Sequence, residues 1–100
     1  METPLSLGLD KQRALARAQS EAARLGYDLT MMEFVFVDAQ LRHPHITAEE
    51  VLAWGKISSE EQQTTWILYG FPKEQSQQGG DILVLVDKAS GSVTRVLAGQ

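Results

Sequence analysis

The residues of this chain best suited to metal or proton chemistry are His43 and His45, which flank a proline and precede Glu49 and Glu50. Two imidazoles at positions i and i+2 of a loop can bind a metal ion, and a single imidazole can act as a general acid or base. No third ligand is fixed by spacing, and nothing in the sequence places a nucleophile beside either histidine. We therefore expect a surface turn here, with no metal site.

Three carboxylates, Asp38, Asp81 and Asp87, stand at the ends of expected strands. A functional pair would need two of them in one cleft with one raised pKa, and aspartates at strand ends more often form turns. Ser90-Gly91-Ser92 lacks both the frame and the strand-to-helix context of a nucleophile elbow, and Gly79-Gly80 lacks the Lys-Ser/Thr of a phosphate loop. The sequence therefore predicts a protein that is not an enzyme and needs no cofactor.

Aromatic residues are concentrated in one expected strand that carries Trp66, Tyr69 and Phe71. Alternation along a strand places Trp66 on one face and Tyr69 with Phe71 on the other. A short helix carrying Trp54 could cover this second face as ordinary core. Otherwise the face is an exposed apolar patch, which on a monomer marks a protein interface. The residues predicted to contact a partner are Trp66, Tyr69, Phe71, Glu74 and Asp81.

A helix must pack on this strand to support it. Good helix formers run from Lys11 to Leu25 after Asp10, a plausible N-cap, and Gly26 is a suitable terminator. One face of that helix carries small and apolar residues at spacings of three and four, namely Ala14, Leu15, Ala18, Ala22 and Leu25. We expect residues 1–9 to form a flexible N-terminal arm and residues 10–100 to form a single α+β domain.

The next segment, Leu29 to Asp38, is interpreted as a strand because Phe34 to Val37 is apolar on both faces and rich in aromatic and β-branched residues. Thr30 and Glu33 could instead form a capping box, so a helix over Met31–Leu41 is the alternative.

The rest of the chain predicts one short helix and an antiparallel meander. Thr47 to Glu50 is a capping box that opens a helix ending near Gly55, and Ser58 to Glu61 could begin another turn. Three strands follow, over residues 65–72, 80–87 and 92–97, with a tight hairpin at Asp87–Gly91. The expected fold class is α+β, in which the N-terminal helix packs on a roughly four-stranded antiparallel sheet with a short inserted helix.

Composition narrows the classes of partner. The 100 residues carry a net charge of −4 and nine scattered Lys and Arg, which does not favour a nucleic-acid partner. No cysteine is present, and no segment has the apolar length of a membrane span or the pattern of a signal peptide. We expect a cytoplasmic protein, or a periplasmic one if a signal was removed, with no membrane partner.

The expected middle strand is apolar at every position from 82 to 86, so both of its faces need cover. One alanine-lined helix can shelter a single face. This shortage of cover predicts that the second face, the 73–80 loop or the acidic edges bind another protein.

Short motifs suggest a family. The hairpin Val86-Asp87-Lys88-Ala89-Ser90-Gly91-Ser92-Val93, together with Trp66 and Gly79-Gly80, resembles features of cystatin-like α+β domains, and it is similar to PepSY-type domains and to bacterial toxin-immunity proteins. The segment between Asp38 and Thr64 has no counterpart in that pattern. The resemblance implies binding, because these families share no catalytic residues.

The function predicted from the sequence is therefore a non-enzymatic, inhibitory protein-binding module, most simply an immunity protein that neutralises a bacterial toxin. Its acidic balance would steer association with a basic toxin surface. One alternative is a structural homodimer of PepSY-like domains. Another is a small cone-shaped domain with a ligand pocket, with His43, His45 or Asp38 at its mouth.

Overall fold

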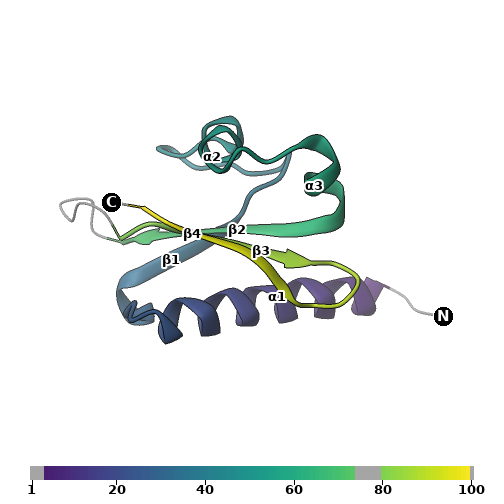
Figure 1. Ribbon diagram of the computed structural model, residues 1–100, viewed down its shortest axis with the longest axis horizontal. Coiled ribbons are helices and arrows are strands. Elements are labelled where there is room, and N and C mark those ends of the chain that lie inside the picture. The colour runs from purple at the N-terminus through teal and green to yellow at the C-terminus, as the bar shows by residue number, and fades with distance from the viewer. Residues whose placement is uncertain (1–3, 74–79, 100) are drawn as a thin grey trace.

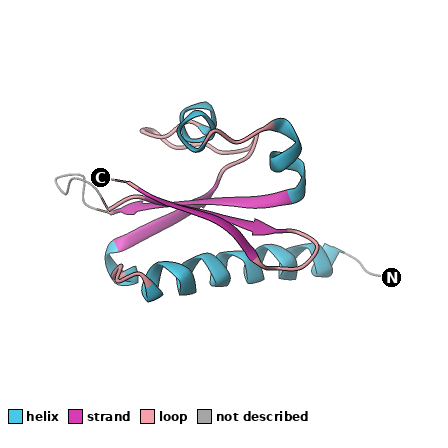
Figure 2. Cartoon of the chain, in the orientation of Figure 1, coloured by secondary structure: helices cyan, strands magenta, loops and turns pink. Residues whose placement is uncertain are grey.

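The computed structural model describes residues 4–73 and 80–99. Its elements in chain order are α1 (Pro4–Arg24), η1 (Leu29–Met31), β1 (Met32–Phe36), α2 (Ala48–Gly55), α3 (Ser59–Thr64), β2 (Thr65–Pro72), β3 (Ile82–Asp87) and β4 (Val93–Ala98). The strands form one antiparallel sheet in the order β1-β2-β3-β4, which confirms the predicted α+β fold class. Three layers are stacked: α1 lies on one face of the sheet, and α2 with α3 lies on the other (Figures 1 and 2).

The long helix begins earlier than predicted. It starts at Pro4, so Asp10 is an exposed residue within the helix and not its N-cap. Residues 4–9, predicted as part of an arm, belong to α1, and residues 1–3 lie outside the described residues. Proline suits the first position of a helix because its φ is already helical and its missing N–H would have no partner there.

Two chain reversals follow the predicted turn chemistry. At the end of α1 the backbone N–H of Tyr27 donates to the carbonyl of Ala22 at 3.0 Å, while Gly26 takes a φ of 98°, as in a Schellman cap. In the β3–β4 hairpin the N–H of Gly91, at φ 77°, donates to the carbonyl of Asp87 at 2.8 Å. Glycine is needed at both positions because other residues rarely adopt positive φ.

The segment around β1 is a strand, as predicted, and the helical alternative over Met31–Leu41 is wrong. The strand is shorter than expected because Leu29–Met31 forms a 3-10 turn. The Asp28 carboxylate caps that turn by accepting the backbone N–H of Thr30 at 3.1 Å and its hydroxyl at 2.7 Å. Thr30 is thereby occupied in the turn and opens no helix.

The alanine stripe of α1 meets the sheet as predicted, but Leu25, predicted on the same helix face, follows the end of α1 and is 45% exposed. The alanines Ala14, Ala18 and Ala22 are buried at 0–2% exposure against Leu68 and the even-numbered residues of β3. Alanine has no side chain beyond Cβ, so α1 can lie close to β2 and β3. Phe34 and Phe36 of β1 also lie on the α1 side.

The second face of the sheet is covered by the protein itself, and the prediction of an open face is wrong at its centre. Residues 37–58 fold back over the sheet and bury Ile67, Leu83 and Leu85 beneath Val37, Val51 and Ile57. The expected two-layer domain is therefore a three-layer one. Periodicity could not reveal this cover because its apolar residues come from two loops and a two-turn helix.

A glycine sets how closely the cover approaches. A Cβ added at Gly55 would lie 2.6 Å from Cδ2 of Leu83, so only glycine lets the end of α2 contact the sheet here. The helix stops at this point because Lys56 takes a left-handed conformation with φ 51°.

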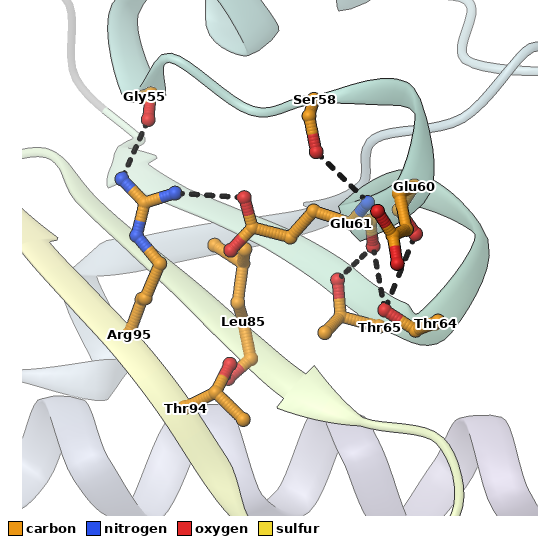
Figure 3. A network of polar contacts seen from close by, with 9 residues as sticks. All are labelled: Gly55, Ser58, Glu60, Glu61, Thr64, Thr65, Leu85, Thr94 and Arg95. Carbon is orange, nitrogen blue, oxygen red and sulfur yellow. Dashed lines mark hydrogen bonds and ion pairs between the residues drawn. The ribbon is translucent and has the colours of Figure 1, made fainter.

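A polar network ties the cover to the sheet edge (Figure 3). Arg95 of β4 donates from Nη1 to Oε1 of Glu61 at 2.9 Å and from Nη2 to the carbonyl of Gly55 at 2.6 Å. The Thr65 hydroxyl also donates to the carbonyl of Glu61 at 2.6 Å. One half-buried guanidinium thus joins β4 to the end of α2 and to α3 through charge-assisted hydrogen bonds.

Candidate functional site

Five aromatic rings form one continuous row where the cover meets one end of the sheet. Neighbouring ring centroids are 6.2 Å apart for Trp54 and Tyr69, 5.5 Å for Tyr69 and Phe71, 5.2 Å for Phe71 and His43, and 6.1 Å for His43 and His45. The row joins α2, β2 and the loop before α2. We call these five residues the aromatic surface.

The local folding rules explain how the rings meet. Tyr69 and Phe71 are two residues apart on β2, so they share a face. Trp54 lies three residues after Val51 on α2, and residues at that spacing share a helix face, so the helix that buries Val51 on the sheet also brings Trp54 toward Tyr69. Trp54 nevertheless remains 40% exposed.

Asp81 fixes the position of Tyr69. The phenolic O–H of Tyr69 donates to Oδ2 of Asp81. The backbone carbonyl of Asp81 accepts the N–H of Gly99 at 2.7 Å and the hydroxyl of Tyr27 at 3.2 Å. Three contacts from three parts of the chain thus hold this carboxylate and the Tyr69 ring in place.

Burial raises the pKa of Tyr69 well above its ordinary value, and the hydrogen bond to the Asp81 carboxylate and its negative charge raise it further. Tyr69 is therefore a neutral hydrogen-bond donor at physiological pH. A base or nucleophile would need a lowered pKa, so this arrangement suits binding better than proton abstraction.

A hollow of about 390 Å³ opens beside the exposed indole. It is lined by His45, Ile46, Glu50, Val51, Trp54, Tyr69, Asp81 and Gly99. We call it the Trp54 pocket. Three aromatic rings, two carboxylates and two aliphatic side chains thus share one concave surface.

The predicted contact residues do not all lie together. Tyr69 and Asp81 line the Trp54 pocket and Phe71 stacks on Tyr69. Trp66 lies on the α1 face, where its ring meets Phe36 at a centroid distance of 6.0 Å. A partner on the aromatic surface therefore cannot contact Trp66 from the same face. The fifth predicted residue, Glu74, lies outside the described residues.

The sequence prediction of contact residues included neither Trp54, which was considered as cover, nor His43, which was expected in a surface turn or at the mouth of a ligand pocket. The spacing of Val51 and Trp54 was a usable signal, because it predicts that both face the sheet. No comparable signal exists for His43, since its place beside Phe71 depends on how the loop folds back. The predicted turn is confirmed: Nδ1 of His43 accepts the backbone N–H of His45 at 3.1 Å.

Two of the three aspartates are turn residues, as predicted. The Asp38 carboxylate accepts the N–H of Gln40 at 2.9 Å, and that of Asp87 accepts the N–H of Ser90 at 2.8 Å. Hydrogen bonding to the Ser90 backbone, reinforced by its side chain, lowers the pKa of Asp87. Within residues 4–73 and 80–99, no group of three or more His, Asp or Glu side chains is placed to hold a metal ion.

A second hollow, of about 450 Å³, lies between α1 and the β3–β4 hairpin. The charged residues of its lining are Asp10, Arg13, Arg17, Asp87 and Lys88. Three cations there face two carboxylates, and Nε of Arg17 donates to the carbonyl of Gly91 at 3.1 Å. We assign this region to holding the hairpin against the helix.

Comparison of the chain with protein-family models, with curated proteins and with solved structures finds no match. The resemblance to cystatin-like, PepSY-type and immunity proteins therefore stays a prediction. None of the described helices is both long and apolar enough to cross a bilayer.

Proposed function

We propose that this chain is a non-enzymatic protein-binding module that contacts its partner through the aromatic surface. The observation that carries the proposal is the exposed indole of Trp54, which continues into four further rings. Trp54 and His45, at the two ends of the row, are exposed, and the three rings between them are partly buried. A continuous, partly open apolar strip of this kind on a folded domain is typical of interfaces. Tryptophan and tyrosine are also the residues that most often dominate interface energetics.

Preorganisation supports the same proposal. The hydrogen bond from Tyr69 to Asp81 and the ring contacts with Trp54 and Phe71 restrict these side chains before any partner arrives. Binding then loses less side-chain entropy, and more of the contact energy appears as affinity.

Within this class we propose an inhibitor of the immunity type, whose partner is an enzyme or toxin. The net charge of −4 supports this choice because it would accelerate association with a basic partner. The likeness of the 86–93 hairpin to immunity proteins supports it as well. If the partner is an enzyme, one equivalent of this protein should abolish its activity.

The test compares three baits: the wild type, Trp54→Ala and Leu25→Ala. Leu25 is a matched control because it is also an exposed apolar residue, at 45%, and it directly follows α1, which lies on the opposite face of the sheet from α2 (Figure 1). A protein captured by the wild type is purified and titrated against each bait. We expect Trp54→Ala to weaken binding at least tenfold and Leu25→Ala to leave it unchanged. Equal affinities for all three would overturn the proposal.

A second copy of this chain is the other candidate partner, because an interface formed by one patch with itself closes a twofold dimer. Analytical ultracentrifugation of the protein alone distinguishes this case. A dimer that Trp54→Ala converts to a monomer would assign the aromatic surface to self-association.

A further inference from the structure

We infer that the Trp54 pocket receives a lysine or arginine side chain of the partner protein. This inference rests on the proposed function and names the chemistry of the group that the partner inserts. Its basis is the combination of carboxylates, aromatic faces and an aliphatic wall in one concave site.

The charge of the pocket comes from two carboxylates. Glu50 is exposed on the first turn of α2, and Asp81, which also lines the pocket, directly precedes β3. Its lining contains no lysine or arginine among the residues that the structure describes. A cation entering the pocket therefore meets two negative charges without a resident cation to displace.

The aromatic walls add a second attraction for a cation. The rings of Trp54 and Tyr69 meet at 75° with their centroids 6.2 Å apart, so they form a corner and not a flat stack. A cation within about 6 Å of such ring faces is attracted by their quadrupoles, most strongly by tryptophan. Tyr69 donates to Oδ2 of Asp81, and no donor among residues 4–73 and 80–99 is hydrogen-bonded to Oδ1, which can accept an ammonium or guanidinium N–H.

The remaining lining suits the stem of a long side chain. Ile46 and Val51 give the pocket an aliphatic wall, on which the methylene groups of lysine or arginine can pack. Gly99 also lines the pocket, and a Cβ there would lie 3.1 Å from Cβ of Asp81 and 3.7 Å from Cζ2 of Trp54, so any larger residue would take up space between these two side chains. The volume of about 390 Å³ falls in the range of small ligand sites.

The experiment titrates the full chain with capped single amino acids and follows the indole and phenol signals of Trp54 and Tyr69 by NMR at physiological salt. The cationic probes are N-acetyl-lysine and N-acetyl-arginine methylamides. Their neutral counterparts of similar shape are the norleucine and citrulline methylamides. We expect each cationic probe to bind about five- to thirtyfold more tightly than its neutral counterpart. The stronger of the two identifies the preferred side chain.

Two matched variants locate the effect. Glu50→Gln removes one charge of the pocket and keeps the capping box, which accepts glutamine. Glu49→Gln removes the neighbouring charge on the same turn, which does not line the pocket. We expect Glu50→Gln to weaken the cationic probes at least threefold and Glu49→Gln to leave them within experimental error, with the neutral probes unchanged by both.

Equal affinities for cationic and neutral probes, or equal losses in the two glutamine variants, would overturn the inference. Its failure is distinguishable from failure of the proposed function. If the probes show no preference but Trp54→Ala still weakens the partner, the cation site is wrong and the binding surface stands. If the probes bind as expected but the partner is insensitive to Trp54→Ala, the proposed function is wrong.

Discussion

Replacement of Gly55 by alanine tests how the cover layer is fitted to the sheet. The new Cβ would lie 2.6 Å from Cδ2 of Leu83 and 3.1 Å from Cδ1 of Ile57. Leu83 is fully buried in the central strand, so its side chain has little room to move away. The end of α2 must instead shift outward, and the 2.6 Å hydrogen bond from Arg95 to the Gly55 carbonyl will lengthen with it.

Two opposing effects set the magnitude. Alanine is a better helix former than glycine by about 0.5–1 kcal/mol in a helix interior, and the gain is smaller at the last helical position. Overpacking a well-filled core costs about 1–3 kcal/mol. The steric effect wins, and we expect Gly55→Ala to lower the free energy of unfolding by about 1–2 kcal/mol. For a domain of this size that corresponds to a fall in Tm of about 4–8 °C per kcal/mol.

Urea denaturation of four proteins measures the effect and its cause: the wild type, Gly55→Ala, Leu83→Val and the double variant. Leu83→Val removes the atom that alanine would meet. In that background Gly55→Ala should cost less than half as much, or become stabilising. If Gly55→Ala stabilises the protein with Leu83 intact, the close approach of α2 to the sheet is wrong.

Three further predictions concern other parts of the fold. The pKa of Tyr69 is raised in the folded protein, so above pH 10 the unfolded chain loses the Tyr69 proton before the folded protein does. The free energy of unfolding of the wild type should therefore fall more steeply with pH than that of Tyr69→Phe, by at most about 1.4 kcal/mol per pH unit. Parallel curves of unfolding free energy against pH for the two proteins would refute the assigned shift. Gly91→Ala should lower the free energy of unfolding in urea by about 1–2 kcal/mol through its backbone alone, because φ is 77° and no atom lies near enough to clash with the new Cβ. Gly91→Asn should lower it less, because asparagine adopts positive φ more readily, and equal costs for the two variants would refute a backbone origin. Arg95→Met should lower the free energy of unfolding by about 1–2 kcal/mol, because it removes charge-assisted hydrogen bonds at a half-buried position. An unchanged urea midpoint would show that the network adds nothing to stability.

The sequence predicted the parts of the fold that depend on local chemistry. The β3–β4 hairpin follows from Asp87 and Gly91, and the stripe of alanines defines the face of α1 that meets the sheet. The start of α1 was missed because Asp10 has the chemistry of a cap while Pro4, at the true start, gives a weaker signal.

Long-range features were not predictable from one sequence. The side of the sheet on which Phe34 lies depends on strand register, and a shift of one residue would reverse it. The fold-back of residues 37–58 depends on where Val37, Val51 and Ile57 find apolar surface, which no short period encodes.

The same division applies to the candidate site. Alternation along β2 correctly paired Tyr69 with Phe71 and separated both from Trp66. Trp54 and His43 join them only because the cover folds over this end of the sheet, so their part in the site is a tertiary property.

The central claim is that the aromatic surface binds a protein, and the most direct measurement is the affinity of the purified partner for variants of equal foldedness. Isothermal titration of the wild type, Trp54→Ala and Leu25→Ala, each checked by thermal melting, provides it. We predict at least a tenfold loss for Trp54→Ala and none for Leu25→Ala. Affinities that agree among all three, with only the melting temperature of Trp54→Ala reduced, would show that the exposed indole is part of the core and not of an interface.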